Sequence, residues 1–167
     1  MGDKGMRVAL CGLLFAGLFM LPAAYGGDGQ SGSVTILLAS ESTRFKNSLI
    51  NELETLFTGE GYKIEKVDHS GDNWNKIKAD DYDAVFISNS GVNSRVRPWV
   101  QGWLNNNRNS SAYILLHTTQ TRDWTVSVDV DSVTSASAMR DVKQLAAVYH
   151  RQIVSAITRR AAEQNEQ

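Results

Sequence analysis

Three unbroken apolar runs constrain the fold more than any other feature of this chain. They are VTILLAS (34–40), DAVFIS (83–88) and SAYILLHT (111–118). A run that is apolar throughout and ends at turn residues is typical of a strand buried on both faces of a sheet. Amphipathic helical patterns follow the first two runs. We therefore expect a three-layer α/β sandwich with a mostly parallel sheet.

Helical spacing is clearest between the first two runs. The face expected to be buried is made by Phe45, Leu49, Leu53, Leu56 and Phe57, and the glycines of TGEG can end this helix. A second helix carries Val96, Val100 and Leu104. A last helix, over roughly 137–160, is expected to bury Met139, Val142, Leu145, Tyr149, Ile153 and Ile157.

Two further strands complete a predicted five-stranded sheet. YKIEKVD (62–68) is more polar and so is expected near an edge, while WTVSVDV (124–130) alternates strictly, as a half-covered strand does. The connection between the fourth and fifth strands is too short for a helix. These two strands are therefore expected either to pair in antiparallel fashion at the edge, or to have lost the usual helix between them.

The first 26 residues have the pattern of a signal peptide. Lys4 and Arg7 precede the apolar stretch 8–21, and Ala24 and Gly26 suit cleavage after Gly26. An uncleaved membrane anchor is the alternative. The sequence thus predicts an exported protein, in the periplasm, whose mature part has no cysteine, because Cys11 lies in the signal.

The mature part is long enough for one domain, expected over 34–160 between a flexible leader (27–33) and a frayed tail (161–167). It carries 15 basic and 17 acidic side chains. Near-neutral charge gives no electrostatic footprint for nucleic acid or an anionic membrane. A protein partner of unknown identity remains open.

Three segments together resemble flavodoxin-like domains. They are ILLASEST before a helix, DYDAVFISNS before a second helix, and AYILLHTTQT in third place. The resemblance covers roughly residues 34–120. It implies that FMN, where such domains hold it, lies at the carboxyl ends of the strands. Three loops of this chain would meet there: 40–44, 88–94 and 117–123.

The first of these loops has donors for a phosphate but departs from the flavodoxin pattern. Ser40, Ser42 and Thr43 offer hydroxyls, and Arg44 offers a cation. Flavodoxins resemble S/T-x-T-G-x-T here, whereas this chain reads S-E-S-T-R-F, without the glycine and with the negative charge of Glu41. The alternative interpretation is that Ser42 or Thr43 simply caps the helix.

The other two loops offer polar groups with equally ordinary explanations. The candidate ligand-binding residues are Ser88, Asn89 and Ser90 in the second loop, with Gly91, and His117, Thr118, Thr119 and Gln120 in the third. The same residue types suit tight turns. His117 is either a catalytic group or a hydrogen-bonded structural one. Trp99 and Trp124 are placed to stack on a flat ring or to cover the sheet edge.

A further stretch, DSVTSAS (131–137), resembles the D-x-x-[S/T]-G-A-[S/T] signature of covalent flavinylation in exported proteins. Asp131, Thr134, Ala136 and Ser137 match, and Ser137 would accept FMN; Ser135 stands where the signature has glycine. The alternative is that Ser135 or Ser137 caps the last helix.

No other site emerges from the sequence. The three histidines lie far apart with no cysteine near them, so no metal site is expected, and no G-x-S-x-G elbow is present. With no catalytic constellation in view, we expect an exported flavodoxin-like binding or interaction module without a cofactor. The alternative is an exported FMN-carrying electron-transfer protein, with FMN in the crevice or on Ser137.

Overall fold

The computed structural model of the chain describes residues 33–93, 95–119 and 126–165. The expected signal peptide and most of the leader lie outside these residues. In the described part the strands and longer helices are β1 (Thr35–Ser40), α1 (Arg44–Gly59), β2 (Lys63–Val67), β3 (Ala84–Ser90), α2 (Pro98–Asn106), β4 (Ile114–Thr119), β5 (Asp131–Ser135) and α3 (Val142–Asn165). Short 3-10 helices are Trp74–Lys76, Ala79–Asp81, Arg108–Tyr113 and Met139–Asp141.

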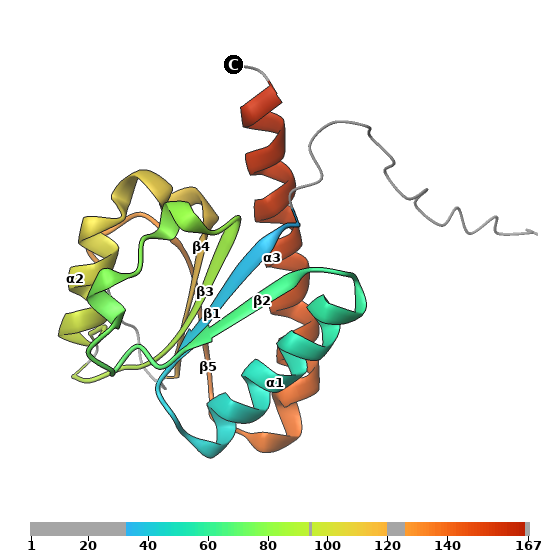
Figure 1. Ribbon diagram of the computed structural model, residues 1–167. Helices are drawn as coiled ribbons and strands as arrows, with labels where there is room; N and C mark the ends of the chain where they lie inside the picture. Colours follow the sequence, from blue (N-terminus) through green and yellow to red (C-terminus); the bar gives the residue numbers. More distant parts are fainter. Residues whose placement is uncertain (1–32, 94, 120–125, 166–167) are drawn as a thin grey trace, which may run out of the picture. The chain divides into compact units, whose positions relative to one another are not determined.

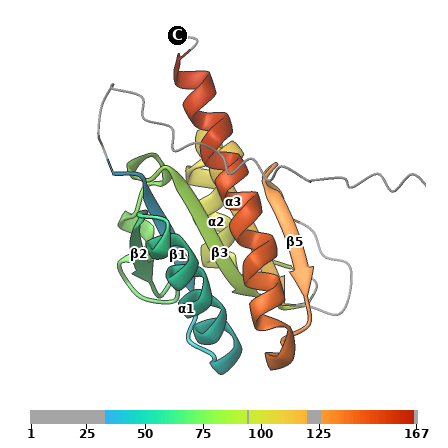
Figure 2. The same ribbon diagram turned by 90° about the vertical axis from the view of Figure 1, so that its right-hand side faces the viewer.

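The strands form one sheet in the order β2-β1-β3-β4-β5. Every pairing in it is parallel, including the edge pair β4–β5, which runs from Leu115 opposite Asp131 to Thr119 opposite Ser135. Helices α1 and α3 lie on one face of the sheet and α2 on the other (Figures 1 and 2). The three-layer α/β prediction is confirmed, and so is the edge position of β2.

The expected antiparallel edge strand is wrong, and so is its location. The edge strand is β5, at 131–135, and the described residues 126–130 form no strand. Val128 is buried instead against the α2 face, with Val126 and Val130 packed beside it. The alternation of Val126, Val128 and Val130 thus belongs to a segment, 126–130, that covers the sheet on this face. Because β5 starts at Asp131, later than expected, enough chain separates it from the end of β4 for the two strands to pair in parallel.

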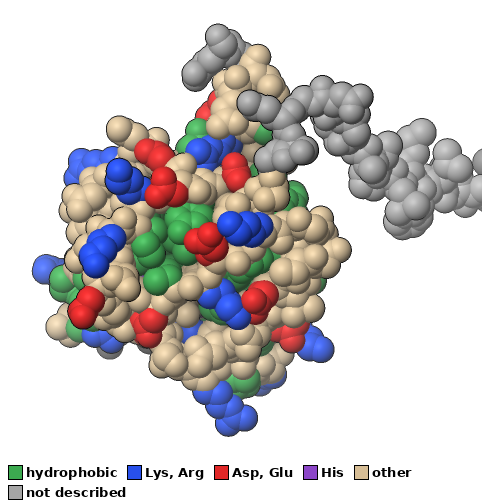
Figure 3. Space-filling view, in the orientation of Figure 1, with side chains coloured by type: hydrophobic (Ala, Val, Ile, Leu, Met, Phe, Trp, Pro, Cys, Tyr) green, Lys and Arg blue, Asp and Glu red, His purple; other side chains and the backbone are tan. Residues whose placement is uncertain are grey.

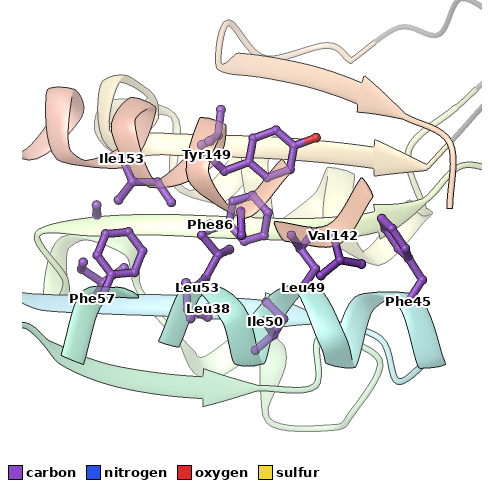
Figure 4. Packing of buried hydrophobic residues seen from close by; sticks show 14 residues of the cluster. Leu38, Phe45, Leu49, Ile50, Leu53, Phe57, Phe86, Val142, Tyr149 and Ile153 are labelled. Atoms are coloured by element: carbon purple, nitrogen blue, oxygen red, sulfur yellow. The ribbon is translucent and has the colours of Figure 1, made fainter. Parts of the chain in front are cut away.

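Each buried strand sends alternate side chains into two separate cores, as period-two geometry requires. Ile36, Leu38 and Phe86 face α1 and α3, whereas Leu37 and Ile87 face α2. In the first core, Figure 4 shows Phe86 beneath Tyr149 of α3, with Leu49, Leu53 and Phe57 reaching over from α1.

Helix α1 begins and ends much as the sequence indicates. Thr43 is its N-cap, with its Oγ1 accepting a hydrogen bond of 3.3 Å from the Lys46 N–H. After the helix, Gly61 adopts a φ of +88°, which glycine tolerates without strain. Leu56, expected on the buried face, is 38% exposed.

Helix α3 is shifted from the predicted range. It starts at Val142 after a 3-10 turn and continues to Asn165, so that residues 161–165, expected in a tail, are helical. Met139 precedes the helix and is exposed, while Ala146 and Ala156 join the buried face. Near the carboxyl end, Arg160 donates to the carbonyl of Tyr82 and lies over the ring of Tyr113.

Candidate functional site

All five described strands end at one edge of the sheet, which gathers the predicted loops. Ser40 of β1 lies opposite Ser88 of β3, and Ser88 lies opposite His117 of β4. The expected convergence of 40–44, 88–90 and 117–119 is therefore present. Whether these residues bind a ligand remains a prediction.

In the first loop two of the three candidate hydroxyl groups accept structural hydrogen bonds. The Thr43 hydroxyl caps α1, and the Ser42 hydroxyl accepts a hydrogen bond of 3.2 Å from the Asn47 amide. Arg44 is exposed at the first position of the helix. This arrangement favours the helix-cap interpretation of the loop.

The centre of the loop is occupied by the carboxylate of Glu41. Its Oε1 accepts a hydrogen bond of 2.7 Å from the Ser90 backbone N–H and pairs with the Lys46 ammonium. Lys46 Nζ also lies 2.7 Å from the Ser90 hydroxyl. Glu41 Oε2 lies 2.8 Å from Nε2 of His69. One side chain thus connects the ends of β1 and β3, helix α1 and the loop after β2.

A tryptophan sets the tautomer of His69. The indole Nε1–H of Trp99 can only donate, and it lies 3.2 Å from His69 Nδ1, which must therefore accept. The proton is then on Nε2, between Glu41 Oε2 and the Ser88 carbonyl at 3.0 Å. Trp99 is 37% exposed. Part of its ring therefore lies at the surface, while its indole N–H points inward to His69.

Glu41 is held in its ionised form. Burial by itself raises the pKa of this carboxyl, but hydrogen bonds from His69, Lys46 and Ser90 and the charge of Lys46 outweigh it, so that the pKa lies well below its ordinary value. Burial lowers the pKa of the Lys46 ammonium, and Glu41 acts in the opposite direction. The pair remains charged because each partner satisfies the other.

The depressed pKa predicts a specific pH dependence for Glu41→Gln. Above the ordinary pKa of 4.5 the wild-type carboxylate stabilises the fold, and below it the unfolded chain takes up the proton first, so this stabilisation fades. We expect Glu41→Gln to lose about 3 kcal/mol of unfolding free energy at neutral pH. The deficit should shrink as pH falls toward about 3. Urea denaturation of both proteins across this range measures it; a deficit independent of pH contradicts the assignment.

A second polar row runs through the core at the ends of β3, β4 and β5. His117 Nδ1 lies 2.8 Å from the Ser88 hydroxyl, and Nε2 lies 2.8 Å from the Ser135 hydroxyl, which also shares a hydrogen bond with Tyr149. The imidazole packs among the rings of Phe45, Phe86 and Tyr149. Burial, helped by the charge of Lys46, lowers the pKa of His117 to about 3.

This environment favours the structural interpretation of His117. A group with so low a pKa is neutral across the physiological range and is a weak general base. Ser135, expected to be a departure from a motif or a helix cap, instead bonds to the imidazole. No side-chain signal of this role is visible in the sequence, since it depends on β5 pairing in parallel with β4.

An NMR titration of the His117 ring tests this assignment. Its carbon-bound proton shifts should stay constant from about pH 8 to about pH 4, because the folded pKa lies below the unfolded value. In denaturant the same ring should titrate near 6.5. The unfolded state therefore takes up this proton first, and stability falls as pH drops below 6.5 toward 3. An inflection near neutrality in the folded protein would show that the ring is reached by water.

Buried donors without partners collect beside this row. Asn89 Nδ2, Thr118 Oγ1 and Arg97 Nε are buried and have no hydrogen-bond partner. Asn89 lies opposite Thr118 in the parallel register, so both side chains point to the α2 face. Asn89 Oδ1 accepts a hydrogen bond of 3.3 Å from the backbone N–H of Arg97. Asn89 and Thr118 thus lie side by side at the ends of β3 and β4, and the Arg97 backbone before α2 is bonded to Asn89.

Helix α2 adds to this donor-rich junction. Its N-cap is Arg97, Pro98 takes the first helical position, and within the described residues no side chain caps it. Its first-turn N–H groups have no acceptor within the helix, and no acidic side chain lies in that turn. Thr119, at the end of β4, turns its hydroxyl toward the Asn89 carbonyl at 3.5 Å.

The remaining predicted residues fall elsewhere. Ser137 is exposed two residues after β5. Gln120 and Trp124 lie outside the described residues. Across the ranges described here, no group of His, Cys, Asp or Glu side chains is arranged to hold a metal ion, and no helix is long and apolar enough to span a membrane.

Lys46 and His69 are the main residues that sequence reasoning missed. Lys46 is 1% exposed and sits in the same helical stripe as Leu49, Ile50 and Leu53. A lysine within an apolar stripe is a usable signal, because a buried ammonium requires an anion nearby. His69 carries no such signal, since its role depends on how the loop after β2 folds over the sheet edge.

Comparison with known proteins identifies the fold. The chain matches no protein-family model, and no curated protein matches it in sequence. Among solved structures, an archaeal flavodoxin matches 75% of this chain and 99% of its own, at 9% identity and a TM-score of 0.50. A flavone reductase matches at 12% identity and a TM-score of 0.53, over 75% of this chain and 63% of its own.

A flavodiiron core from Synechocystis sp. PCC6803 matches with a TM-score of 0.54 at 10% identity, over 77% of this chain. This chain spans only 37% of that protein's length. At such identities the likeness concerns architecture. With the strand order β2-β1-β3-β4-β5, it makes the described part of this chain a flavodoxin-like domain.

The flavodoxin-like fold implies FMN, but the first loop does not fit its phosphate. A phosphate needs free donors at the start of α1. Here the Ser90 N–H and the Lys46 ammonium already bond to Glu41, and the carboxylate adds a negative charge at the same place. The Ser90 N–H and the Lys46 ammonium are therefore already engaged, and the charge of Glu41 opposes a phosphate in this loop.

Proposed function

We propose that the chain is an exported flavodoxin-like binding module, without catalytic activity of its own, whose ligand binds at the carboxyl ends of β3 and β4. The unpartnered buried atoms Asn89 Nδ2, Thr118 Oγ1 and Arg97 Nε carry the proposal. A buried polar group without a partner costs about 1–3 kcal/mol, and such groups persist where function requires them. Export rests on the signal-like first 26 residues.

The donor chemistry narrows the ligand class. An amide N–H, a guanidinium N–H and a hydroxyl together suit carbonyl or carboxylate oxygens of a small molecule or of a partner's loop. The neutral His117 argues against acid–base catalysis, and the negative charge of Glu41 in the first loop argues against a phosphate anchor. On the face drawn in Figure 3, basic and acidic side chains alternate, so this face presents no field of a single sign.

A second candidate is a covalent flavin carrier. It is favoured by the exposure of Ser137, the hydroxyl that the DSVTSAS resemblance marks as the acceptor. In that case FMN would supply electron transfer, and the protein would hold it outside the crevice. The absence of the motif's glycine, replaced by Ser135, counts against this candidate.

The first test is an absorption spectrum of the mature protein purified from its native exported compartment, before and after acid precipitation. A colourless protein that takes up no added FMN is the expected result. Yellow colour released into the supernatant would overturn the proposal in favour of FMN in the crevice. Colour retained in the pellet and lost in Ser137→Ala would establish the covalent carrier.

Replacing Thr118 by valine tests the crevice without knowledge of the ligand. Valine has the shape of threonine and removes an unsatisfied hydroxyl, so Thr118→Val should leave stability unchanged or raise it by up to about 1 kcal/mol. Ser88→Ala is the matched control: it breaks the bond to His117 and should cost about 1–3 kcal/mol. Urea denaturation measures both. A clear destabilisation by Thr118→Val means that the hydroxyl is structural.

A further inference from the structure

The Glu41 carboxylate is surrounded in the way a protein surrounds a bound anion. It receives a backbone N–H from Ser90, the ammonium of Lys46 and the Nε2 side of His69. These groups come from β3, α1 and the loop after β2. Such a mixture of backbone donor, cation and imidazole is the donor set of an oxyanion site.

These surrounding groups are built into the fold and would be present without the carboxylate. The Lys46 side chain is 1% exposed and that of His69 is 0% exposed. His69 is fixed from behind by the Trp99 indole, and Lys46 is fixed by the Ser90 hydroxyl. The site is therefore preorganised, and its shape does not depend on Glu41 alone.

The charges at this place favour a bound anion. The positive charge of Arg97 acts on Lys46 and lowers its pKa, as burial does. Without Glu41, a buried ammonium would face a second cation with no counter-charge in contact. Leaving a buried charge unpaired is costly, so the site favours any anion that fits.

We infer that Ser90 N–H, Lys46 and His69 form an oxyanion-binding site whose resident anion is the carboxylate of Glu41. While Glu41 is present, the site excludes ligands that carry a phosphate or a carboxylate at that point. When the carboxylate is removed, the site accepts a free oxyanion in its place. The inference goes beyond the proposed function, because it concerns the first loop and holds whichever ligand the crevice binds.

Chemical rescue of Glu41→Ala tests the inference. The thermal midpoints of wild type and Glu41→Ala are compared in sodium phosphate, sodium acetate and sodium chloride, at neutral pH and matched ionic strength. A ligand that binds the folded state alone raises the midpoint with its concentration. We expect phosphate, acetate or both to raise the midpoint of Glu41→Ala well above its value in chloride, and to leave wild type unchanged.

Two variants separate a site from a general salt effect. Glu41→Gln fills the same space with a neutral amide, so neither anion should stabilise it beyond chloride. Glu41→Ala combined with Lys46→Met removes the cation, and the rescue seen in Glu41→Ala should disappear. Rescue by acetate without phosphate would indicate a site shaped for carboxylates, and rescue by both would indicate a general oxyanion site.

Three outcomes overturn the inference. One is a Glu41→Ala protein that folds but gains nothing from either anion beyond chloride. Another is an equal gain in wild type, which would mean that the anions bind elsewhere. The third is a Glu41→Ala protein, together with Glu41→Ser as a smaller change, that stays unfolded in phosphate and acetate alike. The flavin spectrum decides the proposed function separately, so the two can fail independently.

Discussion

A parallel sheet covered on both faces imposes the arrangement on which everything else here depends. Its central strands must be apolar on both sides, and the carboxyl ends of all its strands must come to one edge. In this chain the two faces are covered unequally. Helices α1 and α3 cover one face, whereas α2 and the strandless segment 126–130 cover the other. The polar residues that end the strands are therefore brought together beneath the starts of α1 and α2.

The polar groups at the edge of the sheet form two clusters that differ in their hydrogen-bond partners. Around Glu41 and Lys46 the opposite charges are paired, Glu41 Oε1 also accepts from the Ser90 N–H, and Oε2 lies 2.8 Å from His69 Nε2. Around Asn89 and Thr118, donors are buried without partners. The first arrangement stabilises the fold, and the second costs stability. The same edge of the sheet thus carries a cluster of paired charges and a separate group of buried donors without partners.

The sequence predicts the layers, the helices and the edge strand β2 because these depend on local periodicity. The position of β5 escaped prediction, since the alternation of Val126, Val128 and Val130 has the same period whether the segment pairs with a strand or merely covers one. The predicted loops do converge. What could not be predicted is which side chains find partners there, because Ser135 and His69 acquire theirs through contacts distant in sequence.

The two buried histidines differ in a way that follows from their neighbours. An indole can only donate, so Trp99 leaves His69 a single arrangement of its proton. His117 lies between two hydroxyls, of Ser88 and Ser135, and each hydroxyl can either donate or accept. Either nitrogen of this ring can therefore carry the proton, provided that the hydroxyls turn with it. Along the row from Ser88 to Tyr149 the hydrogen bonds can therefore all be donated in one direction or all in the other. The direction is set by the end of the row at which a hydroxyl is fixed.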